Sequence, residues 1–208
     1  MYKLNYFIET DNKLIKQFMN DNSFVSVCGN GNPFPVVTHV PVEISYEEDK
    51  TILIGHIMKN TDHHKAFLKD ENVLCIFNGP HSYISASCYT KPTVASTWNY
   101  MTIHAAGTLR FTDESDTIEI IENLTTKYEG NENAGSFKNL SEEYVNRLVK
   151  AIVGFKINVK SIDAVFKLSQ NHEIDNRKKI IEYLKGLKKD NASLIAKEME
   201  ERIHQPKK

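Results

Sequence analysis

The chain has 208 residues, a formal net charge of -1, 40% hydrophobic residues and 25% charged residues. This length predicts one domain, or one domain with an appendage, which can bury a core without disulfides or a structural metal. The ordinary composition excludes global disorder. Sequence-independent DNA affinity comes mainly from Lys and Arg, so the balanced charge makes direct DNA binding doubtful, although a local basic patch stays open.

The sequence carries no mark of export or of a membrane. It has no run of 18 apolar residues, which predicts no transmembrane helix, and its start lacks the apolar region of a secretory signal. Cys28, Cys75 and Cys88 are far apart and form no C-x-x-C pair. We therefore expect reduced thiols, no metal site and a cytoplasmic location.

Strand patterns dominate the first two thirds of the chain. We expect strands at 23–28, 34–46, 51–57, 73–78, 82–87, 98–111, 153–159 and 164–168. The cluster from Gly29 to Pro33 predicts a hairpin turn, and Pro41 places the second strand at a sheet edge or beside a bulge. Lys91 to Ser96 is expected to be a loop.

Helical patterns lie between and after these strands. We expect helices at 10–20, 61–69, 114–128, 142–150 and 174–202, the last interrupted near Gly186 and Asp190. Thr10 is the predicted cap of the first helix, and Asn60 or Thr61 that of the second. With few crossover helices, this order favours a mainly β fold, an antiparallel barrel with peripheral helices.

The turn from strand to helix after Gly55 is the first candidate site. Lys59, His63, His64 and Lys65 gather cationic groups where a helix start offers unpaired N–H groups, an arrangement that suits a phosphate. The alternative is an ordinary helix cap, with the Asp62 carboxylate in the first turn. A metal is less favoured because no cysteines or clustered carboxylates complete a ligand set.

Three further stretches carry weaker signals. One face of the strand at 98–111 presents aromatic and hydrogen-bonding side chains, which suit a planar ligand, a barrel interior or a dimer contact. The polar residues that follow Phe166 suit a ligand site or an ordinary strand end. The basic face of the helix at 174–202 suits solvent, and nucleic acid is the minority interpretation.

Six motifs together resemble one family. They are Thr38-His39-Val40-Pro41, Gly55-His56 with Lys59-Asn60, Phe77-Asn78-Gly79-Pro80-His81-Ser82-Tyr83-Ile84-Ser85, Thr97-Trp98-Asn99-Tyr100 with His104, Ala151-Ile152-Val153-Gly154-Phe155, and Phe166-Lys167-Leu168-Ser169-Gln170-Asn171. Over about residues 1–185 the chain is similar to the PaiB family, FMN-binding split-barrel proteins named as negative transcriptional regulators. It departs from the family pattern at Ser96, where proline is usual, and at His64, where an aromatic residue is frequent.

The resemblance implies a split β-barrel of the FMN-binding type over residues 1–172, with inserted helices, and a charged helical extension over 173–208. It also implies a homodimer with flavin at the subunit interface, and cofactor contacts from several segments. The implied FMN-binding residues are Thr38, His39, His56, Lys59, Asn60, Thr61, His63, His64, Trp98, Tyr100, His104, Lys167, Ser169 and Gln170. No residue stands out as a nucleophile or general base, so none is assigned to catalysis.

Three functions follow from this resemblance. The first is a flavin-binding regulator of transcription, acting as a flavin-linked sensor. The second is a flavin-dependent oxidoreductase of unknown substrate, in which the flavin supplies the redox chemistry. The third is a split barrel that binds haem or no cofactor. Fold analogy alone does not decide among them.

Overall fold

The computed structural model describes residues 1–2, 4–48, 50–90 and 94–204. These residues form two compact units. Unit 1 comprises Met1–Phe18, Asn78–Ile103 and Asp163–Lys208, and unit 2 comprises Met19–Phe77 and His104–Ile162. The loop expected at 91–96 falls partly outside the described residues. The division of the chain at residue 172 stays a prediction.

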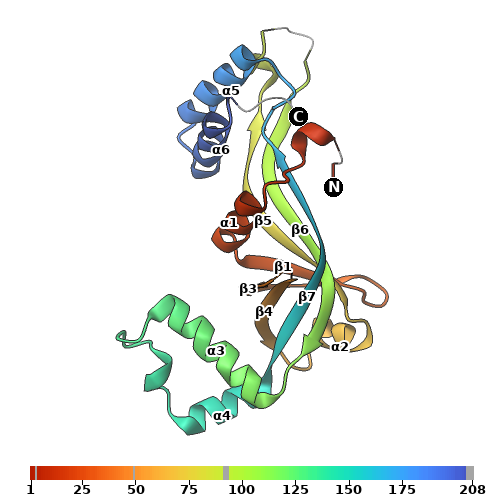
Figure 1. Cartoon of the computed structure of the whole chain (residues 1–208), viewed down its shortest axis with the longest axis vertical. Helices are drawn as coiled ribbons and strands as arrows, with labels where there is room; N and C mark the ends of the chain where they lie inside the picture. Colours follow the sequence, from red (N-terminus) through yellow and green to blue (C-terminus); the bar gives the residue numbers. More distant parts are fainter. Residues whose placement is uncertain (3, 49, 91–93, 205–208) are drawn as a thin grey trace. The chain divides into compact units, whose positions relative to one another are not determined.

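Seven strands form one sheet, in the order β2-β1-β5-β6-β7-β4-β3 (Figure 1). They are β1 (Phe24–Gly29), β2 (Val36–Pro41), β3 (Glu43–Glu47), β4 (Lys50–Met58), β5 (Asn72–Ile84), β6 (Thr97–Phe111) and β7 (Ile152–Lys167). The three long strands β5, β6 and β7 contribute residues to both units. The predicted mainly β architecture is confirmed, and the predicted edge position of the Pro41 strand is confirmed with it.

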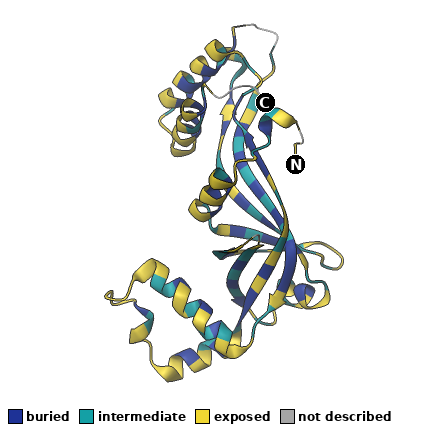
Figure 2. Cartoon of the chain, viewed as in Figure 1, coloured by how far each residue is buried: buried dark blue, intermediate teal, exposed yellow. Residues whose placement is uncertain are grey.

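In unit 2 the sheet curls so that its two ends meet. β2 lies at one end of the strand order, yet the Pro41 carbonyl oxygen lies so close to Gly55 of β4 that an added Cβ would sit 3.1 Å from it. The register of β1 and β2 pairs Val25 with Val40 and Val27 with Thr38. Directly opposed residues share a face, so these side chains line the barrel interior. Figure 2 shows buried residues recurring along the strands.

Six α-helices flank the sheet in the described residues. They are α1 (Asn12–Asp21), α2 (Asp62–Lys69), α3 (Glu114–Glu129), α4 (Glu142–Ala151), α5 (Ile174–Gly186) and α6 (Asp190–Glu201). The break at Gly186 between α5 and α6 is confirmed. The predicted cap of α1 is wrong: the Asp11 carboxylate, one residue past Thr10, accepts from the Lys13 N–H at 2.8 Å.

The two short strands expected at 73–78 and 82–87 are one continuous strand, β5. In the sequence, Gly79-Pro80 is typical of a turn. In the structure, both residues lie inside the strand, and a different contact explains each of them. An added Cβ at Gly79 would lie 2.5 Å from the Phe18 ring, so glycine permits the close approach of α1. β1 pairs with β5 only at Val73–Ile76, so at Pro80 no β1 partner needs the missing N–H.

β7 is likewise continuous where two strands were expected. Its middle residues, from Lys160 to Asp163, are exposed or half-buried, so they lack the alternation of apolar residues by which a strand is recognised. Hydrogen bonding to neighbouring strands, which leaves no trace in hydrophobicity, carries the strand through this polar stretch.

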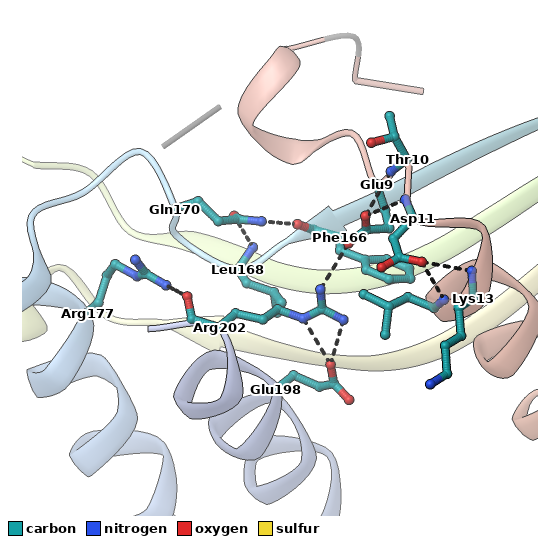
Figure 3. A network of polar contacts seen from close by, with 11 residues as sticks. Glu9, Thr10, Asp11, Lys13, Phe166, Leu168, Gln170, Arg177, Glu198 and Arg202 are labelled. Carbon is teal, nitrogen blue, oxygen red and sulfur yellow. Dashed lines mark hydrogen bonds and ion pairs between the residues drawn. The ribbon is translucent and has the colours of Figure 1, made fainter. Parts of the chain in front are cut away.

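A network of buried charges holds the two ends of the chain within unit 1 (Figure 3). The Arg202 guanidinium pairs with the Glu9 carboxylate at 2.9 Å and with Glu198 at 3.2 Å. The side chains of Arg202 and Glu9 are each only 10% exposed. Arg177 donates to the carbonyl oxygens of Arg202 and Ile203, which satisfies the end of α6.

We expect Arg202→Met to lower the free energy of unfolding by about 3 kcal/mol, because it leaves the buried Glu9 carboxylate without its cation. Urea unfolding followed by circular dichroism measures the change. The control is Glu200→Gln, which removes an exposed pair with Lys185 and should cost less than about 1 kcal/mol. Equal costs for the two variants would contradict a buried, stabilising pair.

Candidate functional site

The start of α2, in unit 2, is a tightly fixed turn. Thr61 caps the helix: its hydroxyl accepts from the His64 N–H at 3.3 Å and donates to the Met58 carbonyl oxygen at 3.0 Å. Asn60, just before it, has a left-handed backbone with φ of 66°, which asparagine tolerates better than most residues. The predicted helix and its Thr61 cap are confirmed.

An anion already lies at this helix start, and it belongs to the chain. The Asp62 carboxylate accepts from the His63 N–H at 2.7 Å and lies 3.1 Å from His63 Nδ1. The hydrogen bond from the His63 N–H, with further contributions from its side chain, holds the pKa of Asp62 below its usual range. The Asp62 side chain is 80% exposed. The position favours negative charge while staying open to solvent.

Cationic groups surround that position. Lys59 Nζ donates to the Val149 carbonyl oxygen at 2.9 Å, which uses one of its three N–H groups. The His63 ring is engaged on both nitrogens, with Thr61 Oγ1 and with Asp62. Burial lowers the pKa of His64, and the charges of His63, Lys59 and Lys65 lower it further. The α2 start therefore concentrates positive potential.

The other predicted residues of unit 2 point in different directions. Thr38 faces the barrel interior opposite Val27, whereas His39 faces outward, with Nδ1 3.0 Å from Ser26 Oγ. His104 is half-buried on β6.

His56 lies on the face of β4 that α3 covers. It is paired in register with Gly154 of β7, where an added Cβ would lie 2.8 Å from Ile120 of α3. His56 Nδ1 is buried and has no hydrogen-bond partner in the described part of the chain. Burial lowers the pKa of this histidine.

The remaining predicted residues belong to unit 1. Trp98 is exposed and lies between His81 and Tyr83, at ring distances of 6.1 and 5.9 Å. Tyr100 is half-buried beside Tyr2, at 6.5 Å. These rings provide the aromatic surface that the sequence pattern predicted on β6.

The segment after β7 is held by its own side chains. Lys167 Nζ donates to Thr97 Oγ1 at 2.8 Å and to the Trp98 carbonyl oxygen. Gln170 bridges the Leu168 N–H and the Phe166 carbonyl oxygen (Figure 3). Ser169 is buried, donates to Asn99 Oδ1 at 3.1 Å and has a left-handed φ of 62°. Such backbone strain persists only where its surroundings impose it.

Two cavities lie beside the predicted residues, one in each unit. The cavity of unit 2, about 470 Å³, lies between the loop of Gly31–Val36 and the α2 side chains Lys65 and Lys69. Its described lining includes Lys65 of the predicted cationic turn, but none of the residues that the resemblance implied for FMN. The sequence marked its loop only as a hairpin turn, which β1 and β2 confirm.

The cavity of unit 1, about 240 Å³, includes Lys167 and Ser169 with residues that the sequence did not single out. Its walls come from the first residues of the chain, from the stretch around Tyr89, and from the segment after β7. No spacing rule connects three segments so far apart. Only the shared abundance of aromatic side chains could have suggested it.

Comparison with known proteins decides the family. Residues 1–161 match the family described as "Putative FMN-binding domain". The Bacillus subtilis (strain 168) protein named "Protease synthase and sporulation protein PAI 2" is 33% identical over 204 residues, which cover 98% of each chain. The chain belongs to this FMN-binding family. The predicted resemblance to PaiB proteins is thereby confirmed.

Solved structures agree on the fold. The flavocytochrome Anf3 from Azotobacter vinelandii matches with a TM-score of 0.61 at 14% identity, over 80% of this chain and 72% of that one. The FAD and heme binding protein from Mycobacterium smegmatis matches with a TM-score of 0.56 at 9% identity, over 77% and 73%. The fold is the predicted split barrel of the flavin-binding type.

The residues at the α2 start fit the phosphate end of FMN. They offer a lysine ammonium, an imidazole and a helix start, where the Asp62 carboxylate already accepts the His63 N–H. Charge-assisted hydrogen bonds of this kind are the strong ones. Within the ranges that the structure describes, no group of three His, Cys, Asp or Glu side chains could hold a metal ion.

His56 gives the stability a defined pH dependence. In the unfolded chain a histidine binds a proton near its ordinary pKa of about 6.5, whereas burial lowers the pKa in the fold. The unfolded state then binds more protons, so the stability contributed by neutral His56 is complete above that pH and is lost on acidification.

We expect His56→Asn to reduce the loss of unfolding free energy between about pH 7.5 and pH 5.5, measured by urea unfolding at each pH. Replacement of the exposed His81 by Asn is the matched control and should leave the pH profile as in the wild type. An unchanged profile in His56→Asn would show that this histidine does not resist protonation in the fold.

Proposed function

We propose that this protein is a cytoplasmic, homodimeric, flavin-linked regulator that holds the FMN phosphate at the start of α2. The three cysteines are free thiols, in keeping with a reducing compartment. No helix in the described residues combines the length and the apolar character needed to cross a membrane. The flavin, when bound, supplies redox chemistry, and the chain's residues position it.

The observation that carries the phosphate site is the Asp62 carboxylate. The helix start holds a solvent-exposed carboxylate from its own first residue, and this contact supports a position that favours negative charge. A phosphate dianion carries more charge and more acceptor atoms than a carboxylate, and it would draw on Lys59 Nζ and the His64 ring. Lys59, Asn60, Thr61, His63 and His64 are thus the proposed phosphate residues, with Thr61 and Asn60 fixing the turn.

The regulatory part of the proposal has separate support. The relative from Bacillus subtilis is named "Protease synthase and sporulation protein PAI 2", and sporulation is a cellular process rather than a substrate. The near-zero net charge argues that regulation does not depend on neutralising DNA phosphates. A flavin whose redox state or occupancy changes with metabolism would give such a regulator its input.

We expect Lys59→Ala to weaken FMN affinity about tenfold, because it removes one charge-assisted hydrogen bond. Asp62→Asn should instead strengthen it, because it removes the charge that competes with the phosphate. Titration of FMN into the purified, flavin-depleted protein, followed by flavin fluorescence, measures both. Lys160→Ala, at an exposed position on β7, is the matched control and should bind as the wild type does.

Opposite signs at Lys59 and Asp62 distinguish a phosphate site from general damage to the fold. If both variants bind FMN as tightly as Lys160→Ala, the phosphate lies elsewhere. If the wild type retains no flavin at any concentration, FMN binding itself fails for this chain.

Direct contact with DNA is tested independently. We expect the FMN-loaded protein to show no affinity for duplex DNA that falls with rising salt in a filter-binding assay. A steep fall in affinity between about 50 and 200 mM salt would show phosphate contacts from a basic patch, and the regulator would then act on DNA directly.

A further inference from the structure

The described lining of the cavity of unit 1 combines an aromatic wall with the ammonium group of a lysine. Tyr2, Tyr6, Phe7 and Tyr89 contribute rings to the lining, and Lys167 contributes the charge. Its volume of about 240 Å³ suits a molecule of one ring rather than a flavin or a nucleotide, for which pockets of about 300–1,000 Å³ are usual.

Lys167 has no acidic partner in this cavity. None of the described lining residues is Asp or Glu, and the hydrogen bonds of Nζ go to neutral oxygens, Thr97 Oγ1 and the Trp98 carbonyl. The Phe7 ring lies 5.6 Å from Nζ. Burial lowers the pKa of Lys167, with no nearby carboxylate to oppose the shift. Because an ammonium has three N–H groups, one donor remains for a ligand.

A second polar atom with spare hydrogen-bonding capacity lies in the same lining. Tyr89 is only 8% exposed, and its buried hydroxyl lies beside the Ser169 hydroxyl without a hydrogen bond of good geometry to any described residue. Burial raises the pKa of Tyr89, and the side-chain interaction with Ser169 opposes that rise. A buried hydroxyl that is only weakly bonded is costly, and most such atoms are satisfied by water or a ligand.

Ser169 explains why the cavity keeps this shape. Its left-handed backbone is held from within unit 1 by the bond from its hydroxyl to Asn99 Oδ1. The N-terminal wall is held by the bridge between Ile8 and Val165 and by the Glu9 N–H, which donates to the Ala164 carbonyl oxygen at 3.0 Å. The cavity is therefore preformed, which lowers the entropic cost of binding.

We propose that this cavity binds a small organic carboxylate with a flat apolar body, its carboxylate on Lys167 Nζ and Tyr89 Oη and its body among the aromatic rings. The ammonium requires an anion, the phenol adds a second donor, and the rings favour a planar apolar group. The described residues of this site belong to unit 1 and include none of the proposed phosphate residues at α2 in unit 2.

The test uses benzoate as the probe and benzamide, nearly the same shape without the charge, as its neutral control. In isothermal titration calorimetry, the purified full chain should bind benzoate at least about tenfold more tightly than benzamide. The flavin spectrum is recorded in the same samples. Retention of the flavin spectrum in the presence of benzoate supports two separate sites.

Two variants test which residues bind benzoate. Lys167→Met should weaken benzoate about tenfold or more and leave benzamide unchanged, and Tyr89→Phe, which keeps the ring, should weaken benzoate by a smaller factor. Lys178→Met, at an exposed position on α5, is the matched control. Thermal melts identify any variant that fails to fold. If Lys167→Met does not fold, Tyr89→Phe still tests where benzoate binds.

Three results would overturn the proposal. They are equal affinity for benzoate and benzamide, benzoate affinity unaffected by Tyr89→Phe and Lys167→Met, and release of flavin as benzoate binds. The last would make the cavity a part of the flavin site. Failure of the α2 phosphate proposal would leave the benzoate measurement unchanged, so the two proposals fail separately.

Discussion

The buried pair between Glu9 and Arg202 is the constraint on which unit 1 depends. Neither side chain can be exposed without pulling away a chain terminus, because one lies near the N-terminus and the other follows α6. Their pairing holds the first residues against β7, and those residues supply Tyr2, Tyr6 and Phe7 to the cavity. Arg177 extends the network by satisfying the carbonyl groups at the end of α6.

Each unit gathers positive charge in a different chemical form. At the start of α2, in unit 2, the charge comes from Lys59 and the helix start, with two imidazoles beside them, and it is partly offset by Asp62. In unit 1, Lys167 lies among aromatic rings, and the described residues that line its cavity include no carboxylate. The first arrangement suits a highly charged group near solvent, and the second suits a weakly charged group with an apolar body.

Much of the fold was predictable because its signals are local. Alternation along β6, the Thr61 cap of α2 and the break at Gly186 each depend on neighbouring residues, and each prediction is confirmed. The continuity of β5 and β7 was not predictable, because it depends on partners distant in sequence. Glycine at position 79 allows the Phe18 ring to approach, and proline at position 80 is tolerated because the pairing with β1 has already ended. Neither reason can be read from the residues around position 80.

The candidate site residues were likewise predictable only where they are close together in the sequence. The cluster from Lys59 to His64 was recognisable because a strand-to-helix turn brings consecutive residues together. The cavity of unit 1 was not, because its lining combines three segments that meet only in the fold. The direction of His56, toward the face that α3 covers, also follows from strand register rather than from its place beside Gly55.

The Asp62 carboxylate also bears on what happens when the cofactor is absent. Because the chain provides its own anion, the N–H of His63 and the imidazole beside it keep an acceptor in the empty protein. Folding of this turn therefore need not wait for flavin, and loss of flavin need not unfold it. The turn can therefore be structured in both the empty and the loaded form.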